Sequence, residues 1–105
     1  MQIKLEADGR RLVAALRGEL DHHAAGSVRE KIDGAVVSND TKELILDFSD
    51  VGFMDSSGIG LILGRYKLMR GKSGSLHIRG VSDRYRRMMQ MAGLEKLNIF
   101  EEDHT

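Results

Sequence analysis

The chain of 105 residues contains no cysteine, no proline and no tryptophan. Without cysteine it can form no disulfide bond and can offer no thiolate as a nucleophile or a metal ligand. Without proline, the ends of its helices must be set by glycine and by polar capping residues. These absences exclude a disulfide-stabilised fold and every form of cysteine-based catalysis.

An excess of one charge and a long apolar run are also missing. The 16 lysines and arginines balance the 16 aspartates and glutamates, so no overall field attracts nucleic acid or an anionic membrane. No apolar stretch approaches the roughly 20 residues that span a bilayer. Residues 1–6 alternate between apolar and polar types and do not look like a signal peptide. We therefore expect a cytoplasmic protein that contacts neither nucleic acid nor a membrane directly.

What is present is the composition of an ordinary globular domain, with 41% hydrophobic and 30% charged residues. We expect one domain over residues 1–105, because a chain of this length builds a single core. Strand-like runs alternate with apolar residues at helical spacing. A hairpin around Asp8 and Gly9 is followed by helix 21–38, strand 44–48, helix 55–71, strand 76–79, helix 82–92 and a short last strand within 97–100. This order predicts an α/β fold with a mixed sheet of four to five strands, an N-terminal β-hairpin and three to four helices.

Local signals make parts of this fold more specific. With Asp8 and Gly9 as the central turn residues, Leu5 faces Leu12 across the hairpin. Asp21 is the expected N-cap of the first helix, and the ordinary role of Ser56 or Ser57 is to cap the second. The loops that begin these two helices follow strands of an α/β sheet, and the carboxyl ends of such strands gather at one end of the molecule. We therefore expect the two loops to be neighbours.

The segment from Phe53 to Gly60 is the most informative part of the chain. It places Ser56 and Ser57 between the end of an apolar strand and a glycine-rich helix start. Backbone N–H groups at such a start lack intrahelical partners, and the helix dipole favours negative charge there. A serine hydroxyl at this point can cap the helix, attack a substrate or accept a phosphate.

Two enzymatic interpretations of this segment find little support. A nucleophile elbow needs G-x-S-x-G, and neither serine has glycine at both of those offsets. A dinucleotide-binding loop needs G-x-G-x-x-G, whereas Gly64 comes one residue too late after Gly58 and Gly60. We therefore expect no catalytic residue in this chain.

Two other clusters of polar residues have simple structural interpretations. Glu19, Asp21, His22 and His23 gather before the first helix, but adjacent histidines on a helix point about 100° apart and rarely share one ion. A capped helix start is the preferred interpretation, and no metal is expected. The arginines at positions 84, 86 and 87 form a basic face on the third helix, for which a solvated surface is preferred to a phosphate site.

Two motifs together resemble a known family. The first is Gly18-Glu19-Leu20-Asp21-His22-His23, and the second is Phe53-Met54-Asp55-Ser56-Ser57-Gly58-Ile59-Gly60, continuing to Lys67. At this separation they closely resemble the bacterial anti-sigma factor antagonists of the STAS domain family, over nearly the whole chain. The nearest likeness within that family is to the anti-sigma F factor antagonists of sporulation. The resemblance implies a small STAS-type domain over residues 1–105 that regulates transcription and is not an enzyme.

The resemblance also implies a phosphorylation switch at Ser56, the serine directly after the motif aspartate. The unmodified protein is expected to bind an anti-sigma factor that is also a serine kinase with bound nucleotide, and so to release a sigma factor. That kinase phosphorylates Ser56, and a PP2C-type phosphatase removes the phosphate. The free protein is expected to be a monomer without a cofactor. The expected partner-binding residues are Asp21, His22, His23, Met54, Asp55, Ser56, Ser57, Gly58, Ile59 and Gly60.

The glycines beside Ser56 sharpen this expectation. Each glycine in a helix interior costs about 1 kcal/mol of stability relative to alanine, so we expect Gly60 and Gly64 to let another group approach closely. A partner packed on Gly58 and Gly60 would not tolerate a phosphate. Two alternatives stay open: a STAS module of a stress-response cascade with another sigma factor, and a nucleotide-binding or enzymatic domain.

Overall fold

The computed structural model describes residues 1–101, and residues 102–105 at the acidic end of the predicted domain lie outside the described part. Strands and helices alternate after an initial pair of strands, as the sequence pattern predicts. The elements in chain order are β1 (Gln2–Asp8), β2 (Arg11–Leu20), α1 (His22–Ser38), β3 (Glu43–Met54), α2 (Ser56–Gly71), β4 (Ser75–Arg79), α3 (Asp83–Met91) and a 3-10 helix (Leu94–Leu97).

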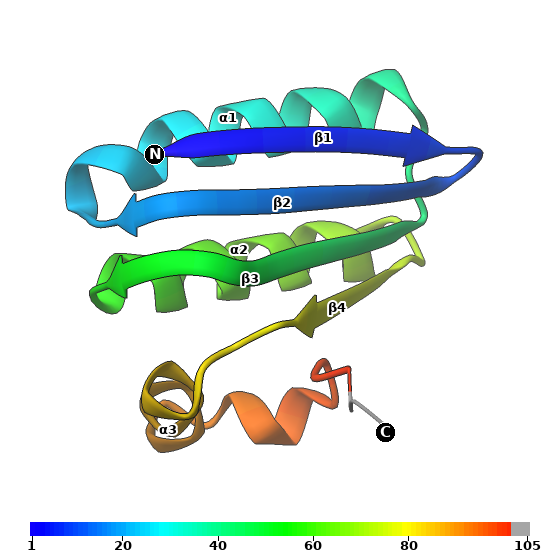
Figure 1. Ribbon diagram of the computed structural model, residues 1–105. Coiled ribbons are helices and arrows are strands. Elements are labelled where there is room, and N and C mark those ends of the chain that lie inside the picture. Colours follow the sequence, from blue (N-terminus) through cyan, green and yellow to red (C-terminus); the bar gives the residue numbers. More distant parts are fainter. Residues whose placement is uncertain (102–105) are drawn as a thin grey trace.

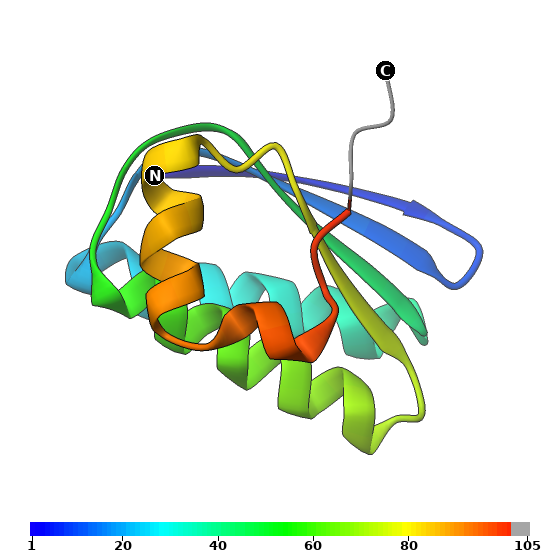
Figure 2. The same ribbon diagram turned by 90° about the horizontal axis from the view of Figure 1, so that it is seen from below.

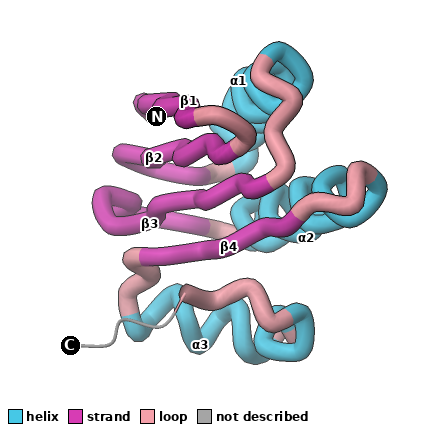
Figure 3. The backbone as a smooth tube through the Cα atoms, turned by 90° about the vertical axis from the view of Figure 1, so that its right-hand side faces the viewer, coloured by secondary structure: helices cyan, strands magenta, loops and turns pink. Residues whose placement is uncertain are grey.

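The four strands form one sheet in the order β1-β2-β3-β4. β1 is antiparallel to β2, and β2, β3 and β4 are parallel to one another. Helices α1 and α2 lie side by side against one face of the sheet (Figure 1). Helix α3 and the 3-10 helix lie beside the β4 edge instead, as Figure 3 shows. The predicted fold class, a mixed sheet with an N-terminal hairpin and three to four helices, is confirmed.

The hairpin has the predicted face but not the predicted register. Leu5 is opposite Ala14, and Asp8 is opposite Arg11. This register makes Gly9 and Arg10 the central turn residues. Gly9 has a φ of 60°, a conformation that glycine readily adopts at the first central position of a hairpin turn. A shift of two residues preserves the side of the sheet on which each side chain lies, so the apolar pattern alone could not reveal it.

The core lies between the sheet and helices α1 and α2, a layering visible in Figure 2. In α1, Val28, Ile32 and Val36 are almost fully buried at the spacing that predicted the helix. Burial of a side chain of this size contributes about 1.5–3 kcal/mol, so these three residues form the main apolar contact of α1 with the core. The facing strand residues are Leu12, Ala14, Leu16, Leu44, Leu46 and Phe48.

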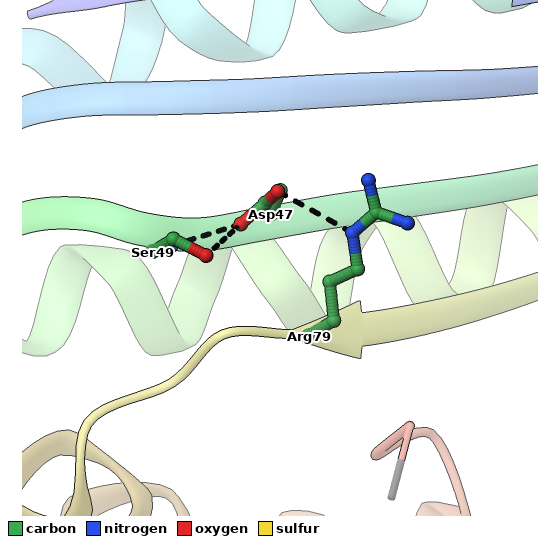
Figure 4. Close-up of polar contacts among 3 residues, drawn as sticks. All are labelled: Asp47, Ser49 and Arg79. Atoms are coloured by element: carbon green, nitrogen blue, oxygen red, sulfur yellow. Dashed lines mark hydrogen bonds and ion pairs between the residues drawn. The ribbon is translucent and has the colours of Figure 1, made fainter. Parts of the chain in front are cut away.

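On the opposite face of the sheet, charged side chains cover a small apolar centre. Ile45 is buried there, next to Val13 in the register of β2 and β3. Figure 4 shows Asp47 between two partners: Ser49 Oγ donates to Asp47 Oδ1 at 2.6 Å, and Arg79 Nε lies 3.3 Å from Asp47 Oδ2. Burial raises the pKa of Asp47, but the hydrogen bonds from Ser49 and Arg79 outweigh it and leave that pKa below its ordinary value.

The predicted last strand within 97–100 is wrong. Gly93 and Asn98 take positive φ angles of 86° and 56° on either side of the 3-10 helix, so the chain bends twice before it reaches the sheet. Only an isolated bridge between Ile78 and Phe100 then forms within the described residues. Among the helices of residues 1–101, none has the length and apolar character needed to cross a membrane.

Candidate functional site

The two predicted loops meet at one end of the molecule, where β2 and β3 both end (Figure 1). The backbone N–H of Asp55 donates to the carbonyl of Leu20 at 3.3 Å. The backbone N–H of His22 donates to Asp55 Oδ2 at 3.2 Å, which joins the start of α1 to the start of α2. The prediction that these loops are neighbours is therefore confirmed.

An aspartate caps each of the two helices. Asp21 Oδ1 accepts a hydrogen bond from the N–H of Ala24 at 2.9 Å, as predicted, and Asp55 Oδ1 accepts one from the N–H of Ser57 at 2.8 Å. The prediction that Ser56 or Ser57 caps α2 is wrong. Asp55 has an extended backbone, with φ −104° and ψ −169°, that carries its carboxylate over the first turn. Neither serine is needed as the cap.

Asp55 is the electrostatic centre of this end of the molecule. The N–H of Ser57 is the main cause that lowers the pKa of Asp55, partial burial opposes it, and the Ser57 hydroxyl and the N–H of His22 lower it further. The carboxylate is therefore ionised at neutral pH. It satisfies N–H groups at the starts of two helices, which otherwise lack partners.

Ser56 is the first residue of α2, and its side chain is exposed. No other residue within 1–101 hydrogen-bonds to its hydroxyl, so the described structure holds no base that would activate it as a nucleophile. The site lies at the positive end of the helix dipole, where added negative charge is favoured. This arrangement suits a serine that is modified better than a serine that attacks.

Two of the predicted partner-binding residues lie below the surface. Met54 is only 2% exposed, and Gly58 is buried. A Cβ atom at Gly58 would clash with the Met54 side chain and lie 3.3 Å from Leu20 Cδ2. Met54 and Gly58 therefore seat the first turn of α2 on the sheet, and direct contact of these two residues with a partner stays a prediction.

The next residues of α2 differ in exposure. Ile59 is half-buried and packs against the core, while Gly60 is exposed. A Cβ atom at Gly60 or Gly64 would meet no atom within 4 Å. Nothing in the described chain therefore requires glycine at these positions, which leaves them accessible to another molecule.

The two histidines at the start of α1 are both exposed. Their ring centroids are 6.1 Å apart, with the rings edge to face. In the described part of the chain, no group of three or more His, Asp or Glu side chains is arranged to hold a metal ion. His22 and His23 thus extend the surface around Ser56 toward α1.

The basic face of α3 has partners within the chain. Arg86 Nε lies 2.8 Å from Glu95 Oε1, and its guanidinium stacks 4.0 Å above the Phe100 ring. The Arg84 guanidinium lies 5.6 Å from the Tyr85 ring centroid. These contacts favour the preferred structural interpretation of this face.

The structure adds two features to the predicted site. Phe53 is 44% exposed at the end of β3, directly before the buried Met54. Strand alternation puts Phe53 and Met54 on opposite sides of the sheet, but the sequence alone does not show which of the two faces the core. The second feature is a groove between α1 and α2 that begins at Ser57 and contains Arg29 and Arg65. It could not be found from sequence, because it depends on how the two helices pack.

Comparisons with known proteins agree on one family. The family model of the STAS domain matches residues 2–105. An anti-sigma F factor antagonist of Paenibacillus polymyxa is 39% identical over 97 residues, which cover 92% of this chain and 83% of the relative. An anti-sigma-B factor antagonist of Bacillus subtilis is 30% identical over 82 residues, which cover 78% of this chain and 73% of the relative.

A solved structure extends the likeness to the fold. The Bacillus cell fate determinant SpoIIAA, in its phosphorylated form, superposes with a TM-score of 0.79 at 33% sequence identity. The match covers 98% of this chain and 92% of SpoIIAA. Sequence motifs, fold and comparisons therefore agree that the chain belongs to the STAS domain family.

Proposed function

We propose that this protein is an anti-sigma factor antagonist that is switched by phosphorylation of Ser56. The unphosphorylated form binds an anti-sigma factor that is also a serine kinase with bound nucleotide, and thereby releases the sigma factor. The kinase phosphorylates Ser56, the complex dissociates, and a PP2C-type phosphatase restores the active form. The protein acts in the cytoplasm, is a monomer when free and catalyses no reaction itself.

One observation carries the proposal: Ser56 is exposed at the first position of α2, and its hydroxyl makes no hydrogen bond to another residue within 1–101. Its surroundings are exposed residues of two helix starts, His22 and His23 on α1 and Gly60 on α2. A kinase can reach this hydroxyl without unfolding the helix. The named relatives and the phosphorylated SpoIIAA structure support a regulatory phosphorylation of this kind.

The physical effect of the phosphate follows from its surroundings. Phosphorylation adds about −1.5 to −2 charges, which the helix dipole and solvent tolerate in the free protein. In a complex, a partner packed on Gly60 and the helix start would have to bury that charge beside the ionised Asp55. A buried charge without a partner is strongly unfavourable. The modified protein is therefore released.

The sigma F pathway of sporulation is the first candidate, because the anti-sigma F factor antagonist of Paenibacillus polymyxa has higher identity and coverage than the anti-sigma-B relative. A stress-response cascade is the second candidate. The proposed chemistry at Ser56 is the same in both. Titration with the anti-sigma F factor and with the anti-sigma-B factor of the same organism would decide between them.

The decisive experiment is phosphorylation in vitro. Incubation with the cognate kinase and ATP, followed by mass spectrometry, should place one phosphate on Ser56. We expect Ser56→Ala to bind the kinase but to remain bound in ATP. Ser56→Asp should bind more weakly by about 2 kcal/mol or more, roughly thirtyfold, because its charge is desolvated in the complex.

Ser57→Ala is the matched control, since Ser57 is the adjacent hydroxyl and is half-buried. It should be phosphorylated like the wild type. A phosphate on Ser57 alone, or no phosphate at all, would contradict the assignment of Ser56. Phosphate transfer with ATP and no kinase, or tight binding of nucleotide by this chain alone, would favour the enzymatic or nucleotide-binding alternative.

A further inference from the structure

A groove of about 450 Å³ runs between α1 and α2 and starts at the predicted phosphorylation site. Small residues form much of its lining, namely Gly26 on α1 and Gly60 and Gly64 on α2. A Cβ atom at any of these three glycines would meet no atom within 4 Å. The groove is therefore deeper than it would be with ordinary side chains, and the fold of this chain does not require that depth.

The charge along the groove has one sign. Arg29 and Arg65 line it, and no acidic residue of the described chain is among its lining residues. Arg29 is exposed, whereas Arg65 is only 7% exposed. A guanidinium carries its charge at every physiological pH, so Arg29 gives the groove one fixed positive charge, and Arg65 gives a second that Asp33 partly compensates.

Arg65 is incompletely satisfied where it is buried. Its Nε lies 2.9 Å from Asp33 Oδ1, but this contact does not have the geometry of a hydrogen bond. Its buried Nη1 also has no hydrogen-bond partner among residues 1–101. Burial is the main cause that lowers the pKa of Arg65, Asp33 opposes it, and Arg29 lowers it further. A buried group with unused donors is rare in folded proteins and calls for an explanation.

We propose that the groove between α1 and α2 receives an acidic side chain of the anti-sigma factor, held by Arg29 and Arg65. A carboxylate is the group whose two oxygens match the donors of a guanidinium. The glycines let the backbone of the partner segment come close enough for a short aspartate or glutamate side chain to reach the arginines. This inference rests on the proposed function, because His22 and Ser57 line the groove and connect it to the surface around Ser56.

The groove adds a second contact of opposite character to the site. Around Ser56 a partner must avoid added negative charge, whereas in the groove a negative charge of the partner is attracted. The two contacts together fix the direction in which the partner segment lies along α2. Phosphorylation at Ser56 then acts on one end of a segment whose other end is anchored at Arg65.

Two variants test the proposal, each with a matched control. Arg29→Glu reverses a groove charge, and Arg87→Glu makes the same change of net charge on an exposed position of α3. Gly64→Leu fills the groove, and Gly34→Leu adds the same side chain at an exposed α1 position that does not line it. Binding of unphosphorylated protein to the cognate anti-sigma factor is measured by calorimetry, and folding is checked by thermal unfolding.

We expect Arg29→Glu and Gly64→Leu each to weaken binding about tenfold or more, while both controls stay within about twofold of the wild type. Wild-type affinity in both groove variants would overturn the groove inference and leave the proposed function intact. Loss of binding in Arg87→Glu equal to that in Arg29→Glu would also overturn it, since overall charge would then explain the effect. Failure of the wild type itself to bind would instead overturn the proposed function.

Discussion

Helices α1 and α2 begin at the same end of the sheet, each behind an aspartate cap, yet their first turns are held in different ways. Within residues 1–101 the Asp21 carboxylate accepts a hydrogen bond only from the N–H of Ala24 in its own helix. The Asp55 carboxylate accepts one from Ser57 in its own helix and one from His22 in the other. Below α2, Gly58 is packed tightly on Met54. The start of α2 is thus fixed from two sides, and the start of α1 depends on it.

The two helix starts therefore differ in how many contacts hold them in place. Ser56 stands on the helix start that is capped, seated on the core and bonded to its neighbour. His22 and His23 stand on the start with fewer attachments. A partner that binds at Ser56 therefore contacts a preformed surface, which lowers the conformational entropy cost of binding. Substitutions at the two helix starts and a change of pH test this difference.

The largest expected effect is the loss of the shared cap. Asp21→Ala should lower the free energy of unfolding by about 1 kcal/mol, the usual cost of losing an N-cap. Asp55→Ala should lower it by clearly more, because N–H groups of two helices lose their acceptor. Urea unfolding measures both, with Asp50→Ala at an exposed position of β3 as the control. If Asp21→Ala and Asp55→Ala lower the free energy of unfolding equally, the hydrogen bond from the His22 N–H to Asp55 contributes nothing to stability.

A smaller effect is expected from adding one methyl group below each helix start. Gly58→Ala forces the buried Met54 to move, a strain of about 1–3 kcal/mol that a gain of about 1 kcal/mol in helix propensity only partly offsets. We expect a net loss near 1 kcal/mol. Gly26→Ala in α1 meets open space and should gain up to about 1 kcal/mol. A stable Gly58→Ala protein would show that α2 is not seated as tightly as described.

The smallest expected effect is on the pH dependence of stability. The pKa of Asp55 in the folded protein lies below its ordinary value of 3.8, chiefly through the N–H of Ser57. A lowered folded-state pKa gives stability that is fully present above pH 3.8 and is lost as the pH falls through the folded-state value. The stability difference between wild type and Asp55→Ala should therefore stay level from pH 7 down to pH 3.8 and shrink as the pH falls further toward the folded-state pKa. A difference that stays constant below pH 3.8 would mean that the carboxylate charge is unimportant for the cap.

Sequence patterns could predict the elements because each carries a strong periodic signal. The buried residues Val28, Ile32 and Val36 of α1 recur at helical spacing, and the run 44–48 lies within β3. The two loops could be placed together because parallel strands end at the same edge. The position of Ser56 at a helix start was predictable for the same reason. Its phosphorylation stays a prediction.

Details that depend on tertiary packing were not predictable. The hairpin register differs because two registers related by two residues bury the same face. The capping role of Asp55 required its backbone angles, since aspartate and serine both favour that position. Burial of Met54 and the groove containing Arg65 arise from contacts between distant segments. No local spacing encodes such contacts.

The short bridge between Ile78 and Phe100 has a consequence for solubility. The N–H of Ile78 donates to the carbonyl of Ile99 at 2.7 Å, and the N–H of Glu101 donates to the carbonyl of Ile78 at 2.8 Å. These bonds occupy part of the β4 edge. The β1 edge carries Lys4 and Glu6, charges that discourage pairing with another sheet. A chain cut before Asn98 would expose β4 to strand addition and hence to aggregation. Residues 99–101 thus block part of the β4 edge to which another sheet could otherwise add a strand.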